Sequence, residues 1–84
     1  MFQIEFLPDA RKALQTMPRN VRELILSKIE TLALTPFDAP NVRRLRGRDG
    51  WRLRVGAWRI IYTVDATRLT IVVLTIATRG KVYR

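Results

Sequence analysis

Apolar and polar residues alternate at the start of the chain with the period of a strand, and the pattern then changes to that of a helix. Residues 2–6 alternate strictly, which predicts a half-buried strand. Pro8 follows, and proline suits the first turn of a helix because its missing N–H needs no partner there. The apolar positions at helical spacing around it are Leu7, Ala10, Leu14 and Met17. This pattern predicts a short amphipathic helix with one face on a core.

A second helix follows almost directly after Pro18, which closes the first one. Its N-terminus is capped either by Asn20 or by Thr16 with Pro18 in the first turn. Pro36 marks its end, since the residue before a proline disfavours helical geometry. The apolar stripe of this helix consists of Val21, Leu24, Ile25, Ile29 and Leu32. Two short helices joined this tightly predict an antiparallel helical hairpin.

The second half of the chain has the pattern of a loop followed by a β-hairpin. Residues 37–50 are expected to form a loop. Its breakers are Pro40, Gly47 and Gly50. Residues 51–55 and 58–64 alternate apolar and polar positions, which predicts two strands. Gly56-Ala57 between them has the glycine-first composition of a two-residue hairpin turn.

A last strand completes the predicted fold. After a turn at residues 65–67, residues 69–78 are almost continuously apolar up to Gly80, which predicts an internal strand of the sheet. The order is then β-α-α-β-β-β: an N-terminal strand, a two-helix hairpin and a three-stranded antiparallel meander. We expect a single α+β domain over residues 1–84, with the helices packed on one face of a four-stranded sheet.

The surplus positive charge of the chain lies in its second half. Residues 1–40 carry five basic and five acidic groups, whereas residues 41–84 carry eleven basic groups and two acids. Seven of those eleven are arginines between Arg43 and Arg59. Self-repulsion at this density destabilises a compact fold, so it favours a polyanionic partner, and nucleic acid is the first to consider.

Strand alternation places several of these arginines on one face of the predicted sheet. Arg52 and Arg54 point away from the core, and the two-residue turn pairs Arg54 with Arg59 across the hairpin. Like charges opposite each other are destabilising, and a bound phosphate would offset that cost. The plain alternative is a solvated face on which arginine stems cover apolar surface. Arg79, just after the last strand, is placed to complete the cluster.

Three aromatic residues have both a structural and a binding interpretation, and a fourth has only a structural one. Trp51 and Trp58 have the planar faces on which bases stack, but their alternation with apolar neighbours favours a place in the core. The same alternation favours the core for Tyr62. Tyr83, close to the basic residues at the end of the sequence, either stacks on or exchanges a proton with a substrate, or simply docks on the sheet.

Composition removes several kinds of chemistry. The chain has no histidine and no cysteine, so it lacks the commonest general base, the commonest metal ligand and any disulfide. Its seven carboxylates are scattered along the sequence, so we expect no metal site and no cofactor. We find no apolar run long enough for a signal peptide or a membrane span, and we expect a cytoplasmic protein.

Several segments together resemble a known family. They are WRLRVGAWRIIY at residues 51–62, the strand before Pro8, the helix break at Pro18, Leu45-Arg46-Gly47, and TRGKVYR at residues 78–84. In this ordered combination the chain resembles the RelE/ParE superfamily of bacterial and archaeal toxins over essentially its whole length. Members are toxins of type II toxin–antitoxin pairs. The RelE-like branch cuts mRNA in the ribosomal A site, whereas the ParE-like branch poisons DNA gyrase and lacks the nuclease residues.

The resemblance implies catalytic roles for residues at matching positions. Arg52 and Arg54 match basic residues that face the scissile phosphate, and Arg59 matches an arginine that holds phosphate. Arg79 matches the arginine assigned to transition-state stabilisation or leaving-group protonation, and Tyr83 matches the tyrosine that orients the base. These filled positions favour the RelE-like branch. Basic residues expected to bind further RNA are Arg43, Arg44, Arg46, Arg48 and Lys81.

The resemblance also implies partners and leaves two other functions open. A metal-independent, ribosome-dependent endoribonuclease would act on mRNA and the ribosome, and an antitoxin would cover it in a hetero-oligomer. Some family members have lysine where this chain has Arg52 and Arg54, and arginine effectively cannot give up its proton to act as a general base. The alternatives are a ParE-like gyrase inhibitor and a catalytically silent nucleic-acid-binding homologue.

Overall fold

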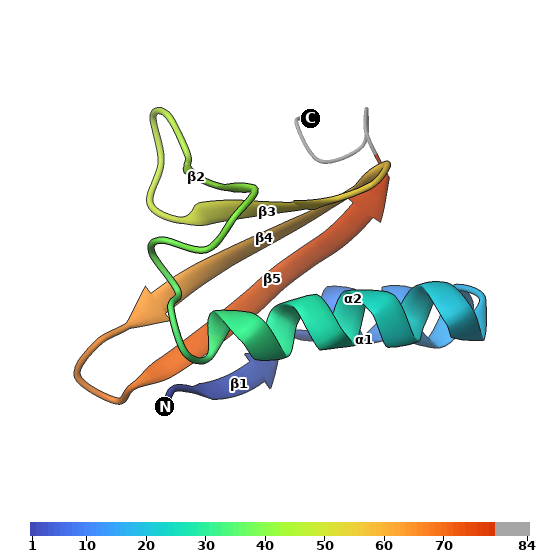
Figure 1. The fold of residues 1–84 in the computed structure, drawn as a ribbon, viewed down its shortest axis with the longest axis horizontal. Helices are drawn as coiled ribbons and strands as arrows, with labels where there is room; N and C mark the ends of the chain where they lie inside the picture. Colours follow the sequence, from blue (N-terminus) through green and yellow to red (C-terminus); the bar gives the residue numbers. More distant parts are fainter. Residues whose placement is uncertain (79–84) are drawn as a thin grey trace.

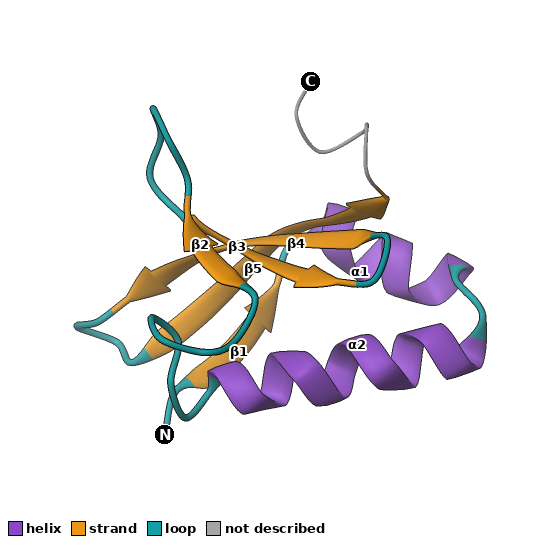
Figure 2. Ribbon diagram, turned by 45° about the horizontal axis from the view of Figure 1, so that its top comes forward, coloured by secondary structure: helices purple, strands orange, loops and turns teal. Residues whose placement is uncertain are grey.

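A computed structural model describes residues 1–78 of the chain (Figure 1). Two helices and five strands follow one another along the sequence. Their order is β1 (Gln3–Phe6), α1 (Pro8–Thr16), α2 (Arg19–Leu32), β2 (Val42–Arg44), β3 (Trp51–Val55), β4 (Trp58–Asp65) and β5 (Thr70–Thr78). Both helices pack on the same face of the sheet (Figure 2), which confirms the predicted α+β architecture. No helix within residues 1–78 combines the length and apolar character that a membrane crossing needs.

The sheet has five strands in the order β1-β5-β4-β3-β2, one more than predicted. The additional strand β2 lies in the segment expected to be a loop and pairs antiparallel with β3 at the edge of the sheet. It is only three residues long, so it carries too little alternation to be recognised as a strand. β1 pairs with β5 in parallel, so the sheet is mixed. β5 is internal, as predicted, between β1 and β4.

The helical hairpin forms as predicted but is capped differently. Pro8 occupies the first turn of α1, where its missing N–H is harmless. Pro18 is the N-cap residue of α2 and no side chain caps that helix, so neither Asn20 nor Thr16 has the predicted role. Arg22 instead reaches back to the end of α1, where Nε donates to the Leu14 carbonyl at 2.7 Å. This bond satisfies a carbonyl that the end of the helix leaves without a partner.

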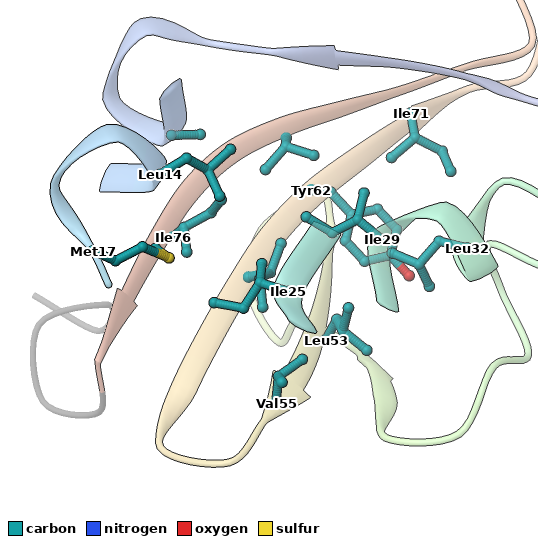
Figure 3. Packing of buried hydrophobic residues seen from close by; sticks show 13 residues of the cluster. Leu14, Met17, Ile25, Ile29, Leu32, Leu53, Val55, Tyr62, Ile71 and Ile76 are labelled. Carbon is teal, nitrogen blue, oxygen red and sulfur yellow. The ribbon is translucent and has the colours of Figure 1, made fainter. Parts of the chain in front are cut away.

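The core lies between the two helices and the inner face of β3, β4 and β5. Ile25, Ile29 and Leu32 of α2 are 0–1% exposed, and Figure 3 shows Ile29 and Leu32 beside the ring of Tyr62. Leu24, predicted to lie in the same stripe, is 51% exposed because it sits at the outer margin of the buried face. The predicted core positions of Trp51, Trp58 and Tyr62 are confirmed, with both tryptophans packed at its margin.

Tyr62 joins the core to the segment after α2, which gives a first prediction. Its hydroxyl donates to the Pro36 carbonyl at 2.6 Å, and the side chain is fully buried. Tyr62→Phe leaves that carbonyl without its donor, and we expect it to lower the free energy of unfolding by about 1–3 kcal/mol. Burial also raises the pKa of Tyr62 above its ordinary value of 10.0.

The direction of this pKa change sets the pH dependence. The folded state favours neutral Tyr62, so its contribution is complete below pH 10 and is lost as the pH rises above 10, where the unfolded chain ionises first. Urea unfolding between pH 8 and pH 11 should therefore show a steeper loss of stability for the wild type than for Tyr62→Phe. Parallel curves for the two proteins would contradict this assignment.

Candidate nucleic-acid interface

The face of the sheet opposite the helices carries the first pair of functional candidates. Arg54 of β3 and Arg59 of β4 are cross-strand partners next to the Gly56-Ala57 turn, in the predicted register. Their neighbours Val55 and Ile60 belong to the core on the helix side, so the two arginines point to the other face. Directly opposed side chains in a strand pair have Cβ atoms about 4.5–5.5 Å apart. Two cations are therefore held side by side.

β2 adds a second pair that the sequence did not predict. Arg43 of β2 is the cross-strand partner of Arg52 of β3. Arg52 and Arg54 are two residues apart on one strand, so both pairs lie on the same face. We call the four residues Arg43, Arg52, Arg54 and Arg59 the arginine face, with Arg54 and Arg59 as its turn row and Arg43 and Arg52 as its edge row. Two rows of opposed like charges would destabilise the sheet without an anion.

Arg59 has the least favourable environment of the four. The residue is only 7% exposed, although neither helix covers this face. In the part of the chain that the structure describes, its Nε and Nη1 atoms are buried and have no hydrogen-bond partner. A guanidinium remains charged at any physiological pH, so it cannot escape this cost by losing a proton. Buried donors of this kind are normally paired, and anionic oxygens are the strongest acceptors for a guanidinium.

Three ion pairs join described residues outside the arginine face. Arg68 pairs with Glu5 at 3.5 Å and with Asp65 at 3.8 Å, and the first of these pairs links the β4–β5 turn to β1. Arg19 pairs with Glu23 on α2 at 2.9 Å. Within residues 1–78, Arg43, Arg54 and Arg59 have no carboxylate partner. The positive charges of Arg43, Arg54 and Arg59 are thus left for an external anion.

Three other residues predicted to bind RNA lie outside the arginine face: Arg44, Arg46 and Arg48. Arg44 is paired with Trp51 and lies over its ring, with the guanidinium carbon 5.6 Å from the ring centroid, on the helix side of the sheet. Arg46 and Arg48 are exposed in the loop between β2 and β3. The remaining candidates, Arg79, Lys81 and Tyr83, lie outside the described residues.

The loop between β2 and β3 depends on a glycine that fixes the register of the edge row. Gly50 has φ +130°, and a Cβ atom there would lie 3.1 Å from the carbonyl oxygen of Tyr62. The Leu45 amide donates to the Gly50 carbonyl at 3.0 Å and closes the loop. Only glycine adopts this conformation at so close an approach without strain. Gly50 therefore positions Arg43 opposite Arg52.

Comparison with known proteins shows a family and solved structures that are similar to this chain. The family described as the ParE toxin of type II toxin–antitoxin system, parDE, matches residues 4–83. No curated protein matches the sequence. A chain of the archaeal RelE–RelB complex from Pyrococcus horikoshii OT3 is 27% identical, with a TM-score of 0.81 over 95% of this chain and 97% of that one.

Two further solved structures share the fold at lower identity. The isolated Escherichia coli RelE toxin is 23% identical, with a TM-score of 0.81 over 99% of this chain and 92% of that chain. A YoeB/ParE toxin from Agrobacterium tumefaciens is 18% identical, with a TM-score of 0.81 over 93% and 99% of the two chains. At these identities the likeness concerns the fold alone.

Proposed function

This chain belongs to the ParE toxin family of type II toxin–antitoxin systems, and we propose that it is the toxin of such a pair and cleaves mRNA on the ribosome in the manner of RelE. The observation that carries the proposal is the arginine face, above all the buried Arg59 guanidinium with two donors lacking partners. A phosphodiester supplies anionic oxygens in the geometry that guanidinium groups bind. Because the proposed substrates, ribosomes and mRNA, are in the cytoplasm, we propose that the protein acts there.

RNA brings its own nucleophile to such a site. The 2′-hydroxyl oxygen attacks the adjacent phosphorus, the bond from phosphorus to the 5′-oxygen breaks, and the products are a 2′,3′-cyclic phosphate and a 5′-hydroxyl. The 2′-proton must leave and the departing 5′-oxygen must gain one. The protein then needs to align these atoms in line and to stabilise the extra negative charge on the phosphoryl oxygens.

The arginines fit the electrostatic part of this task. Arg54 and Arg59 of the turn row bind the scissile phosphate, with Arg52 beside them on β3. Donors already in place when charge develops need no reorganisation, which makes the fixed Arg59 the strongest contributor. Arg79, carried over by resemblance, completes the set at the leaving oxygen, and Tyr83 orients the base. Metal and cofactor have no part in the proposal.

None of these arginines can remove the 2′-proton. A guanidinium keeps its proton at neutral pH, and the chain contains no histidine. The proton acceptor is therefore to be sought in Lys81, Tyr83 or a group of the ribosome. A site that lacks its own base fits a toxin that depends on the ribosome to bend and position the mRNA.

An antitoxin is the second proposed partner. Several solved structures similar to this chain are toxin–antitoxin complexes, among them the RelE–RelB complexes from Pyrococcus horikoshii OT3 and Methanococcus jannaschii. The arginine face would attract an acidic partner, and the exposed edge strand β2 has backbone groups that an added strand could pair. We propose that such an antitoxin covers the arginine face in a hetero-oligomer.

One observation favours a different target. The family model that matches the chain describes the ParE toxin, and the ParE-like branch inhibits DNA gyrase. In that case the arginine face would contact gyrase or DNA without cutting RNA. A catalytically silent homologue would bind nucleic acid with a steep salt dependence and leave mRNA intact.

The deciding experiment is mRNA cleavage by the purified chain with and without programmed 70S ribosomes, with the cut mapped relative to the A-site codon. A cut inside that codon only when ribosomes are present supports the RelE-like proposal. No cut under either condition overturns it, and inhibition of gyrase supercoiling in a parallel assay would then establish the second candidate.

Arg54→Gln provides a graded test of the turn row. Arg54 is exposed and lies opposite Arg59, so its contact with phosphate is partly screened by water. We expect cleavage on ribosomes to fall by about tenfold, which is the effect of about 1.4 kcal/mol in the transition state. Lys28→Gln removes the same charge from α2 on the other side of the sheet and should leave cleavage unchanged. Equal losses for both variants would show that only net charge matters.

A further inference from the structure

Arg54 and Arg59, with Arg52 beside them, are assigned to the scissile phosphate, which leaves Arg43 of the edge row without a role. We propose that Arg43 binds the phosphate next to the scissile one, so that a single RNA strand runs obliquely across the arginine face from the turn row to the sheet edge. This inference rests on the proposed function for the identity of the scissile phosphate. It adds a second backbone subsite and assigns it to β2, the strand that the sequence pattern did not predict.

Arg43 lies too far across the sheet to share the scissile phosphate with Arg59. Arg59 is on β4 and Arg43 on β2, two strand spacings or about 10 Å apart, and the rows are two residues or about 7 Å apart along the strands. Arg59 is buried, so its guanidinium cannot follow a ligand toward the edge. A phosphate held by Arg59 therefore lies away from Arg43, whereas the next phosphate of an extended strand lies closer to it.

The charge and exposure of Arg43 suit a backbone contact. Its side chain is exposed, and within residues 1–78 it has no carboxylate partner. Its register partner Arg52 stands between it and the turn row, so the positive potential is continuous along the proposed path of the RNA. Side chains that contact phosphate position a nucleic acid without reading its sequence.

The backbone around Arg43 is held in place before any ligand binds. The Arg54 amide donates to the Asn41 carbonyl at 3.0 Å and the Val42 amide donates to the Ala39 carbonyl at 3.3 Å, while Gly50 closes the other end of the loop. The bonds from Arg54 to Asn41 and from Leu45 to Gly50 hold β2 against β3 on both sides of Arg43. A fixed site binds its ligand with less loss of conformational entropy than a mobile loop would.

The test separates binding from cleavage. The probe is a fluorescent RNA hexanucleotide with one 2′-deoxy nucleotide at the cleavage position, which cannot react, and its affinity is measured by anisotropy at several salt concentrations. Neutral methylphosphonates replace its phosphates one at a time. We expect Arg43→Gln to weaken binding of the unmodified probe by roughly three- to tenfold and to reduce the salt slope by about 0.7, the value for one phosphate of a single strand.

Coupling between protein and probe is the decisive readout. When the phosphate adjacent to the scissile one is neutral, Arg43→Gln should cause no further loss, whereas Arg54→Gln should still weaken binding. Arg44→Gln, the same change one residue away on the opposite face, should couple to neither phosphate. Three results would overturn the proposal. Arg43→Gln could weaken binding of every probe equally, or the effect of Arg44→Gln could depend on which phosphate is neutral. The third is that the unmodified probe does not bind at low salt. Thermal unfolding of each variant checks that it is folded.

The two proposals fail in different ways. Coupling of Arg43 to the adjacent phosphate, together with no cleavage of ordinary mRNA on ribosomes, would retain the backbone subsite and remove the nuclease. Cleavage in the A site without any coupling at Arg43 would retain the nuclease and remove the subsite.

Discussion

Arg59→Met should make the protein more stable and nearly inactive. Arg59 is only 7% exposed, and its Nε and Nη1 atoms have no partner among the described residues. Methionine keeps much of the volume of the side chain and removes the uncompensated charge. We expect the free energy of unfolding to rise by about 1–3 kcal/mol, the usual cost of a buried polar group without a partner.

The same substitution removes the donors that we assign to the scissile phosphate. Loss of one preorganised donor of this kind lowers a rate by about 100- to 1,000-fold, and we expect that loss in cleavage on programmed ribosomes. Urea unfolding measures the first effect and single-turnover cleavage the second. Arg54→Met is the matched control, because the exposed partner across the hairpin should lose activity without any gain in stability.

Opposite changes in stability and activity would identify Arg59 as a residue retained for function at the expense of the fold. A destabilised Arg59→Met protein would contradict the assignment, since it would mean that the guanidinium stabilises the sheet by itself. An active Arg59→Met protein would remove Arg59 from the phosphate site, whatever its stability.

The sequence predicted the turn row well because a tight turn determines register. Gly56-Ala57 leaves two residues between the strands, so the pairing of Val55 with Trp58 and of Arg54 with Arg59 follows directly, and the structure confirms both. Alternation along each strand then assigns the faces. These are local relations, and local relations can be read from residue order.

The edge row and the burial of Arg59 could not be predicted in the same way. β2 is a three-residue strand, and its pairing with β3 depends on the conformation of a loop closed by Gly50. The only sequence signal for it is Val42-Arg43-Arg44 between Pro40 and Gly47, which equally fits a loop. The burial of Arg59 is a property of the folded sheet, which the alternation pattern of one strand does not predict.

The helices show a similar division. Prolines at positions 8 and 18 correctly bracket α1, because a missing N–H and a fixed φ act on the backbone directly. The predicted N-cap of α2 was wrong because a capping side chain is only one of several ways to satisfy the first amides of a helix. Leu24 was misplaced because helical spacing gives the direction of an apolar stripe but not its width.

The proposed chemistry makes its largest prediction on the substrate. An mRNA with a single 2′-deoxy nucleotide immediately 5′ to the scissile phosphate should not be cut, because the attacking oxygen is absent. An intramolecular nucleophile acts with an effective molarity of about 10⁵ M or more, so its removal should take cleavage below detection. Single-turnover reactions on programmed ribosomes, with products separated by electrophoresis, measure this directly.

A second placement of the same modification controls for effects on binding. A 2′-deoxy nucleotide on the 3′ side of the scissile phosphate leaves the nucleophile intact, and this mRNA should be cut at a rate close to that of the unmodified one. The unmodified mRNA should yield a 2′,3′-cyclic phosphate and a 5′-hydroxyl. Cleavage of the 5′-side analogue at the normal rate would mean that water is the nucleophile. The arginine face would then have to orient that water as well as the phosphate. Activating the water needs a proton acceptor, and Arg52, Arg54 and Arg59 cannot act as one.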